Sequence, residues 1–94
     1  MSRASYEYRY TVTGWYTEAA LAQGFIEEAS SGNKRVTIKA TLKGRNQVNM
    51  YLIRLSENDK ELYFETCKNL SKARQMFTRM CRIHKLNHPK FNPQ

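Results

Sequence analysis

The sequence predicts an α+β fold, in which a mostly antiparallel four-stranded sheet carries two helices on one face. Residues 5–13 and 34–43 alternate apolar and polar side chains as half-buried strands do, two further short segments also fit strands, and two segments repeat apolar residues at helical spacing, in the order β-α-β-β-β-α. Residues 47–55 carry apolar groups on both faces, which suggests a central strand covered on both sides. The 94 residues allow one domain, and their 40% apolar content supports one small core. We expect residues 1–88 to form this domain and residues 89–94 to be a flexible tail.

The first part of the chain predicts one strand followed by one helix. Residues 5–13 alternate, with three tyrosines on one face, which indicates a half-buried strand. Residues 15–30 carry apolar side chains three and four positions apart, which favours a helix capped by Thr17 or Thr13. The turn-forming residues 30–33 would end this helix.

Three strands and a second helix are predicted next. The strands cover residues 34–43, 47–55 and 60–67, and turns at residues 44–46 and 57–59 separate them. A glycine at positive φ, Gly44, would form the first of these turns. The last helix is expected from about Ser71, its cap, to Asn87, where His88 and Pro89 stop it.

The chain is strongly basic, and its positive charge is segregated. Sixteen Lys and Arg residues stand against eight Asp and Glu residues, for a net charge of +8. Residues 34–46 and 68–94 contain no acid and together hold twelve of the sixteen cations. Blocks of one sign create a local field that a mixed surface lacks, so the pattern predicts binding to a polyanion.

Two regions are expected to carry this binding. The face of the sheet left open by the helices would present Arg9, Thr11, Arg35, Thr37, Lys39, Thr41 and Lys43, joined by Tyr51 and Tyr63 if their strands pair in the expected register. Lys68, Lys72 and Arg74 would crowd the N-terminus of the last helix, where backbone N–H groups favour a phosphate. Solvated lysines on an ordinary sheet surface are the alternative interpretation. The predicted nucleic-acid-binding residues are Arg35, Lys39, Lys43, Arg45, Lys68, Lys72, Arg74, Arg79 and Arg82.

Two general resemblances accompany these residues. The expected α-β-β-β-α order from residue 15 onward resembles double-stranded-RNA-binding domains, and Ser71-Lys72-Ala73-Arg74 is similar to the basic start of their last helix. The chain lacks that family's Gly-Pro-x-His loop and paired lysines. A three-stranded meander followed by an amphipathic helix also resembles small domains that lay a sheet in the major groove of DNA. We assign the chain to neither group.

Catalytic and metal-binding motifs are absent from the sequence. It contains no GxGxxG, Walker, GxSxG or HExxH pattern, so we predict neither an enzyme nor a cofactor. Four side chains could in principle bind zinc: Cys81, His84 and His88 on one face of the last helix, and Cys67 just before it. Their spacing matches no common zinc finger. A Cys–His catalytic pair would lack a third group to orient it.

We therefore expect a small, non-enzymatic nucleic-acid-binding protein, with DNA favoured over structured RNA. The alternative is a protein-binding modulator or inhibitor, for example a virus-encoded one, whose basic patch meets an acidic or nucleic-acid-binding host protein and whose exposed Tyr51, Ile53 or Tyr63 anchors the contact. The sequence has no long apolar run, so we expect no membrane span. It has no apolar stretch behind Met1, so we expect no secretory signal. Two cysteines fit a reducing cytoplasm, and the protein would be a monomer or a homodimer.

Overall fold

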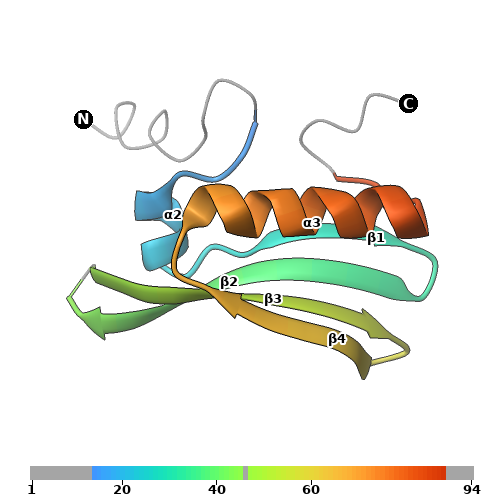
Figure 1. The fold of residues 1–94 in the computed structure, drawn as a ribbon, viewed down its shortest axis with the longest axis horizontal. Helices are drawn as coiled ribbons and strands as arrows, with labels where there is room; N and C mark the ends of the chain where they lie inside the picture. The colour runs from blue at the N-terminus through green and yellow to red at the C-terminus, as the bar shows by residue number, and fades with distance from the viewer. Residues whose placement is uncertain (1–13, 46, 89–94) are drawn as a thin grey trace.

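A computed structural model describes residues 14–45 and 47–88. In chain order these residues form α2 (Glu18–Ala22), β1 (Glu27–Ser31), β2 (Lys34–Gly44), β3 (Gln47–Glu57), β4 (Lys60–Cys67) and α3 (Leu70–His84). The strands make one antiparallel sheet in the order β1-β2-β3-β4, with both helices on the same side of it (Figure 1). The predicted α+β class, with four antiparallel strands and two helices on one face, is confirmed.

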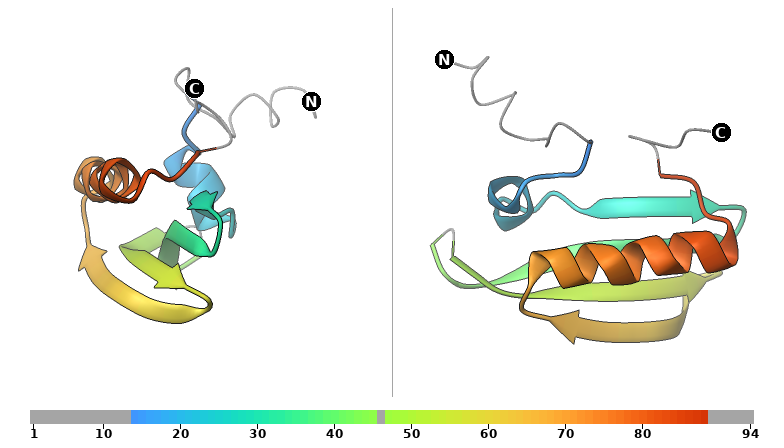
Figure 2. Two further views of the ribbon diagram at one scale, coloured as in Figure 1. Left: turned by 90° about the vertical axis from the view of Figure 1, so that its right-hand side faces the viewer. Right: turned by 45° about the horizontal axis from the view of Figure 1, so that its top comes forward.

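The core lies between the sheet and the helices. The inner face of the sheet contributes a buried cluster from three strands, namely Ala29, Val36, Ile38, Tyr51, Ile53 and Leu55. Leu21 of α2 and Phe77 of α3 pack into this cluster, and the two side chains are 2% and 1% exposed. The left view in Figure 2 shows the two layers end-on, and the right view shows α3 running along the sheet. Because both helices cover the inner face of the sheet, no described element covers its outer face.

The predicted helix over residues 15–30 is wrong. The observed helix is only the five residues of α2, capped by Thr17, whose Oγ1 accepts a hydrogen bond from the Ala20 N–H at 3.1 Å. Gly24, with φ of 105°, lies just beyond the end of α2, and the chain then enters β1. The turn at residues 30–33 therefore joins two strands, with Gly32 at φ of 61°. The predicted strand over residues 5–13 lies outside the described residues.

The two long hairpins match the predicted strands closely. Asn58 and Asp59 both have positive φ, as a tight two-residue turn between antiparallel strands requires. The expectation for Gly44 is wrong, because this residue stays in the ladder opposite Gln47 and its φ is not positive. The ladder between β2 and β3 shifts register near Leu42, so this hairpin contains an irregularity that increases its twist.

The last helix begins and ends earlier than predicted. Asn69 is the cap, since its side-chain oxygen accepts from the Lys72 N–H at 3.0 Å, and Ser71 already lies inside the helix. Lys85 adopts a left-handed conformation with φ of 56° and terminates α3. The chain then runs along the edge of β1, where Asn87 and Ser30 exchange two backbone hydrogen bonds of 3.0 Å. This return anchors the C-terminal end of the domain to the sheet.

Candidate nucleic-acid interface

The fold brings parts of the two acid-free segments to one end of the sheet. Tyr51 and Cys67 form the last described pair between β3 and β4, and the β2–β3 ladder continues past this point to Gly44 and Gln47. Since α3 begins three residues after Cys67, its first turn lies at the same end as the β2–β3 hairpin (Figure 1). We call the exposed cations gathered here the basic end; they are Lys43, Arg45, Lys68 and Lys72.

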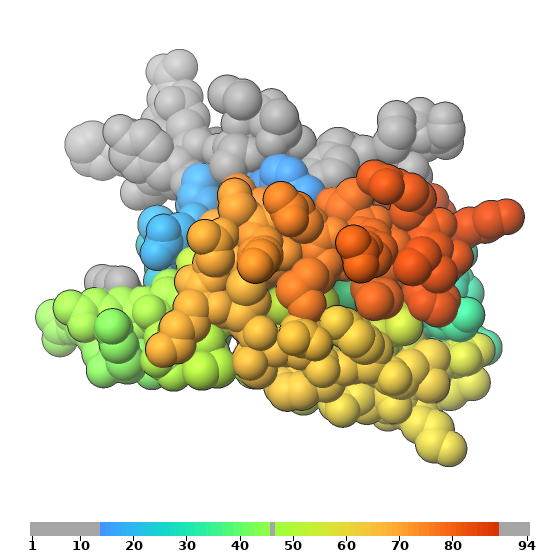
Figure 3. Space-filling view, viewed as in Figure 1, coloured from blue at the N-terminus to red at the C-terminus, as the bar shows by residue number. Residues whose placement is uncertain are grey.

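The hairpin of the basic end projects beyond the rest of the sheet. Residues 47–50 extend past the end of β4, which corresponds to about 13 Å of two-stranded ribbon. Figure 3 shows this ribbon standing out from the body of the molecule, below the start of α3. Gln47 and Asn49 are exposed on it, beside the two cations near its turn. The ribbon therefore offers positive charge and amide groups on a narrow arm.

The exposed side of α3 continues the positive surface. The helix contains no acidic residue in its first turn, and Lys72, Arg79 and Arg82 are exposed along it. Arg79 and Arg82 line a shallow hollow of about 390 Å³ together with Arg74. A second hollow, of about 460 Å³, lies where β4 and α3 diverge and is lined by Lys72, Arg79 and one carboxylate, Glu65. The helix thus presents a row of cations that starts at the basic end.

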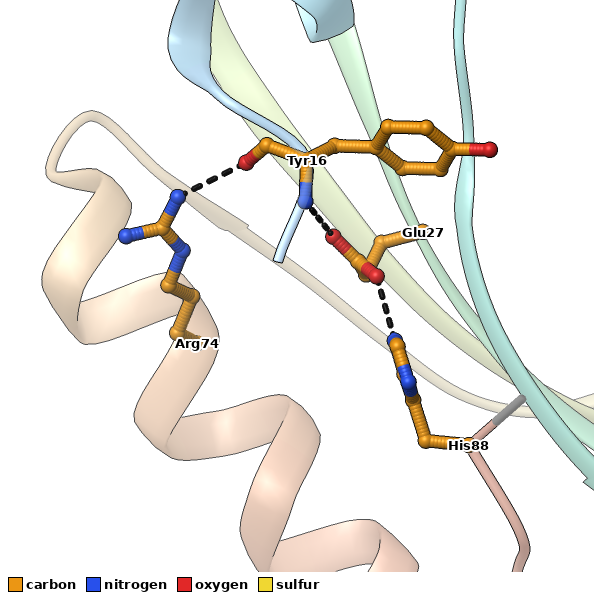
Figure 4. A network of polar contacts seen from close by, with 4 residues as sticks. All are labelled: Tyr16, Glu27, Arg74 and His88. Carbon is orange, nitrogen blue, oxygen red and sulfur yellow. Dashed lines mark hydrogen bonds and ion pairs between the residues drawn. The ribbon is translucent and has the colours of Figure 1, made fainter. Parts of the chain in front are cut away.

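Arg74 has a different role from its neighbours. Its Nη2 donates a 2.8 Å hydrogen bond to the Tyr16 carbonyl oxygen, and its guanidinium lies 5.4 Å from the centre of the Trp15 ring. Figure 4 shows this contact crossing from α3 to the segment that precedes α2. Its Nε is buried and has no hydrogen-bond partner among the described residues. Among the predicted binding residues, Arg74 therefore has a structural role, because it joins α3 to the segment that precedes α2.

The open face of the sheet matches the prediction only in part. Register places Arg35, Thr37 and Lys39 on the outer face, opposite in direction to the buried Val36 and Ile38. Arg35, however, lies at the far end of the sheet from the hairpin, between two carboxylates. Its guanidinium is 3.8 Å from Glu28 and 3.7 Å from Asp59. Lys39 remains the exposed cation of this face nearest to the basic end.

The three predicted anchor side chains are not on the open face. Tyr51 and Ile53 are 2% and 0% exposed and belong to the core, because their parity matches that of the inner-facing residues. Burial and the nearby Glu18 carboxylate raise the pKa of the Tyr51 hydroxyl. Tyr63 also lies on the inner side, at the margin of the core, where it donates to Glu65 at 3.1 Å. The prediction for these residues is wrong.

A buried polar network was not anticipated from the sequence. Glu27 of β1 is 2% exposed, and its Oε1 accepts the Tyr16 N–H at 2.9 Å. Its Oε2 is hydrogen-bonded to Nε2 of His88, which is 5% exposed and packs against the rings of Trp15 and Phe77 (Figure 4). Two distant segments of the chain are thus fastened to β1 by one carboxylate. We assign this network a structural role.

The four candidate zinc ligands are not brought together. His88 faces Glu27, His84 lies 3.3 Å from the Lys34 ammonium, and the Cys67 thiol lies 3.2 Å from the Asn69 carbonyl oxygen. Burial raises the pKa of the Cys81 thiol to about 11, which keeps it protonated. Among residues 14–45 and 47–88, no group of three or more His, Cys, Asp or Glu side chains is placed to hold a metal ion.

Comparison with known proteins adds no identification. No protein-family model, curated protein or solved structure matches this chain. Within the described part of the chain, no helix has the length and apolar character needed to cross a membrane. Function must therefore be inferred from the arrangement of the side chains.

Proposed function

We propose that this protein binds nucleic acid through the basic end and the exposed side of α3, with duplex DNA as its preferred ligand. The observation that carries the proposal is the meeting of two separate acid-free segments at one end of the sheet. Four exposed cations on two elements can contact phosphates of one backbone or of two. Charge scattered for solubility alone would not need this convergence.

The shape of the basic end supports DNA as the ligand. A two-stranded β-ribbon fits the major groove of B-form DNA, which is about 12 Å wide, whereas the major groove of A-form RNA is too narrow for side chains to read. The β2–β3 hairpin is such a ribbon. Gln47 and Asn49 on it have the amide groups that pair with base edges, and Lys43 and Arg45 flank them with positive charge. Lys68 and Lys72 would then meet the phosphates beside the groove.

Single-charge variants at the basic end test the proposal. Lys43→Gln, Lys68→Gln and Lys72→Gln each remove one exposed cation. Each phosphate contact changes the logarithm of the binding constant by about 0.9 for a tenfold change in salt concentration. Relative to 1 M salt, one contact therefore contributes about 8-fold to affinity at roughly 0.1 M salt, and each variant should lose that factor. The matched control is Lys60→Gln, which removes an exposed cation from the first residue of β4, at the opposite end of the sheet. Its affinity should stay within about twofold of that of the parent protein.

Fluorescence anisotropy with labelled duplex DNA, duplex RNA and single-stranded DNA gives the measurement. The proposal requires the duplex DNA to bind most tightly and the three basic-end variants to lose affinity while Lys60→Gln does not. Equal losses for all four variants would mean that binding follows net charge and not the basic end. Weak and equal binding of all three nucleic acids would favour the alternative, in which an acidic protein surface meets the same cations.

A further inference from the structure

The outer edge of β4 has no partner in the described part of the chain. β4 is the last strand of the sheet, and no described segment pairs with its second side. The opposite edge of the sheet differs, because Asn87 pairs there with Ser30 of β1. In Figure 1, β4 forms the lower border of the sheet while α2 and α3 lie above it. An edge strand with open N–H and C=O groups is a template for pairing with another strand.

The side chains of β4 favour such pairing. Leu62 and Phe64 are 49% and 41% exposed, with the Arg54 guanidinium 5.3 Å from the centre of the Phe64 ring, so apolar area is open beside this edge. The strand also carries two carboxylates, Glu61 and Glu65, against one cation, Lys60. In a chain with a net charge of +8, this strand therefore offers a second copy a surface with little repulsion, in contrast to β2, which holds four cations and no acid.

We propose that a second copy of this chain pairs with β4 in an antiparallel manner, so that two sheets join into one. A two-fold axis perpendicular to the joined sheet must pass midway between the two copies of one residue, and charge excludes two of the three positions at the centre of β4. An axis at Tyr63 would place Glu61 of each copy opposite Glu65 of the other, which makes two contacts between like charges. An axis at Glu65 would place the two Glu65 carboxylates together. An axis at Phe64 avoids both contacts, and like charges directly opposite each other are unfavourable.

The Phe64 register also makes favourable cross-strand pairs. The two Phe64 rings would lie opposite each other on the outer face, and Leu62 would meet the aliphatic part of Thr66 of the second copy. On the inner side, Tyr63 would lie opposite Glu65 of the second copy. The Tyr63 hydroxyl already donates to Glu65 of its own strand at 3.1 Å, so the pairing keeps a carboxylate within its reach. The pairing would centre on residues 63–65 of each strand, because the β3–β4 ladder has an irregularity at Leu62.

Sedimentation equilibrium or light scattering across a wide range of protein concentrations tests the dimer. The expected result is a concentration-dependent rise from 11.1 kDa to twice that mass. Phe64→Lys should raise the dissociation constant of the dimer about tenfold or more, because it places two ammonium groups face to face. The control is Ile83→Lys, which adds the same charge at an apolar residue of α3 that is 61% exposed, and which should leave the dimer unchanged. A monomer at all concentrations, or equal effects of both variants, would overturn the proposal.

A disulfide test checks the register directly. In a background of Cys67→Ser and Cys81→Ser, Phe64→Cys should cross-link under mild oxidation, because opposite Cα atoms in an antiparallel pair lie about 4.5–5.5 Å apart, within disulfide range. Thr66→Cys should not cross-link, because Thr66 would face Leu62 of the second copy. Circular dichroism shows whether both variants are folded. Cross-linking that is equal for the two variants, or stronger for Thr66→Cys, would overturn the proposed register.

Discussion

Replacing Glu27 by alanine should destabilise the protein far more than its place on a short edge strand suggests. Glu27 is 2% exposed and accepts hydrogen bonds from the Tyr16 N–H and from His88 Nε2. Loss of a buried hydrogen-bond partner costs about 1–3 kcal/mol, so the two together predict a loss of about 2–6 kcal/mol in the free energy of unfolding. Because small domains are stable by only about 5–15 kcal/mol, this is a large share.

Urea unfolding followed by Trp15 fluorescence measures this loss. Trp15 is the only tryptophan in the sequence, and its ring centre lies 5.5 Å from that of His88, so its signal reports on the network. The control is Glu28→Ala, one residue along the same strand but on its opposite face. Glu28 is half exposed and, among the described residues, forms a 3.8 Å ion pair with Arg35, so its loss should cost less than about 1 kcal/mol.

Equal unfolding midpoints for Glu27→Ala and Glu28→Ala would show that the buried Glu27 network stabilises the protein no more than the surface ion pair does. If Glu27→Ala does not fold, Glu27→Gln provides the measurement, since its amide oxygen can still accept the Tyr16 N–H. A double-mutant cycle with His88→Ala should give a coupling of about 0.5–3 kcal/mol between the two side chains. A coupling of zero would mean that their contact does not contribute to stability.

Three further outcomes follow from the local geometry. Asn69→Ala should lower the free energy of unfolding by about 1 kcal/mol through loss of the cap, whereas Ser71→Ala should be nearly neutral; equal effects in thermal unfolding would contradict the assigned cap. Arg74→Ala should cost about 1.5–3 kcal/mol through its lost bond to the Tyr16 carbonyl oxygen, measured by urea unfolding, and an unchanged midpoint would show that this bond is dispensable. Because burial raises the pKa of the Cys81 thiol to about 11 from 9.0, alkylation of Cys81 near pH 8 should be about a hundredfold slower in the folded than in the urea-unfolded protein, and equal rates by mass spectrometry would contradict that burial.

β2, β3, β4 and the existence of α3 could be predicted from the sequence, because each depends on a pattern within its own segment. The three strands from Lys34 to Cys67 are short segments rich in β-branched and aromatic residues that end at turn-forming residues, and the structure has them within two residues of the predicted ends. α3 has an apolar stripe at helical spacing that includes the buried Ala73 and Phe77 and continues to Met80, so its existence was also predictable. Its cap was not, since both Asn69 and Ser71 are good capping residues and only the observed hydrogen bond selects between them.

The region that was predicted wrongly depends on contacts between distant residues. Residues 15–30 have apolar side chains at helical spacing, but Glu27 is held in a strand by His88, sixty-one positions away, and Ser30 by Asn87. A buried carboxylate looks like a surface residue in a sequence, so nothing local indicates its partner. The same limit applies to the site, since Arg74 is as basic as Lys72 and only its contact with Tyr16 separates their roles.

The salt dependence of DNA binding measures how many cations of the basic end contact phosphates. Affinity for one duplex should be measured against salt concentration for the parent protein and for a variant with glutamine at Lys43, Arg45, Lys68 and Lys72. If these four cations contact phosphates, the slope of log affinity against log salt should be steeper in the parent by about 3.6. Identical slopes for the two proteins would show that the basic end does not bind DNA.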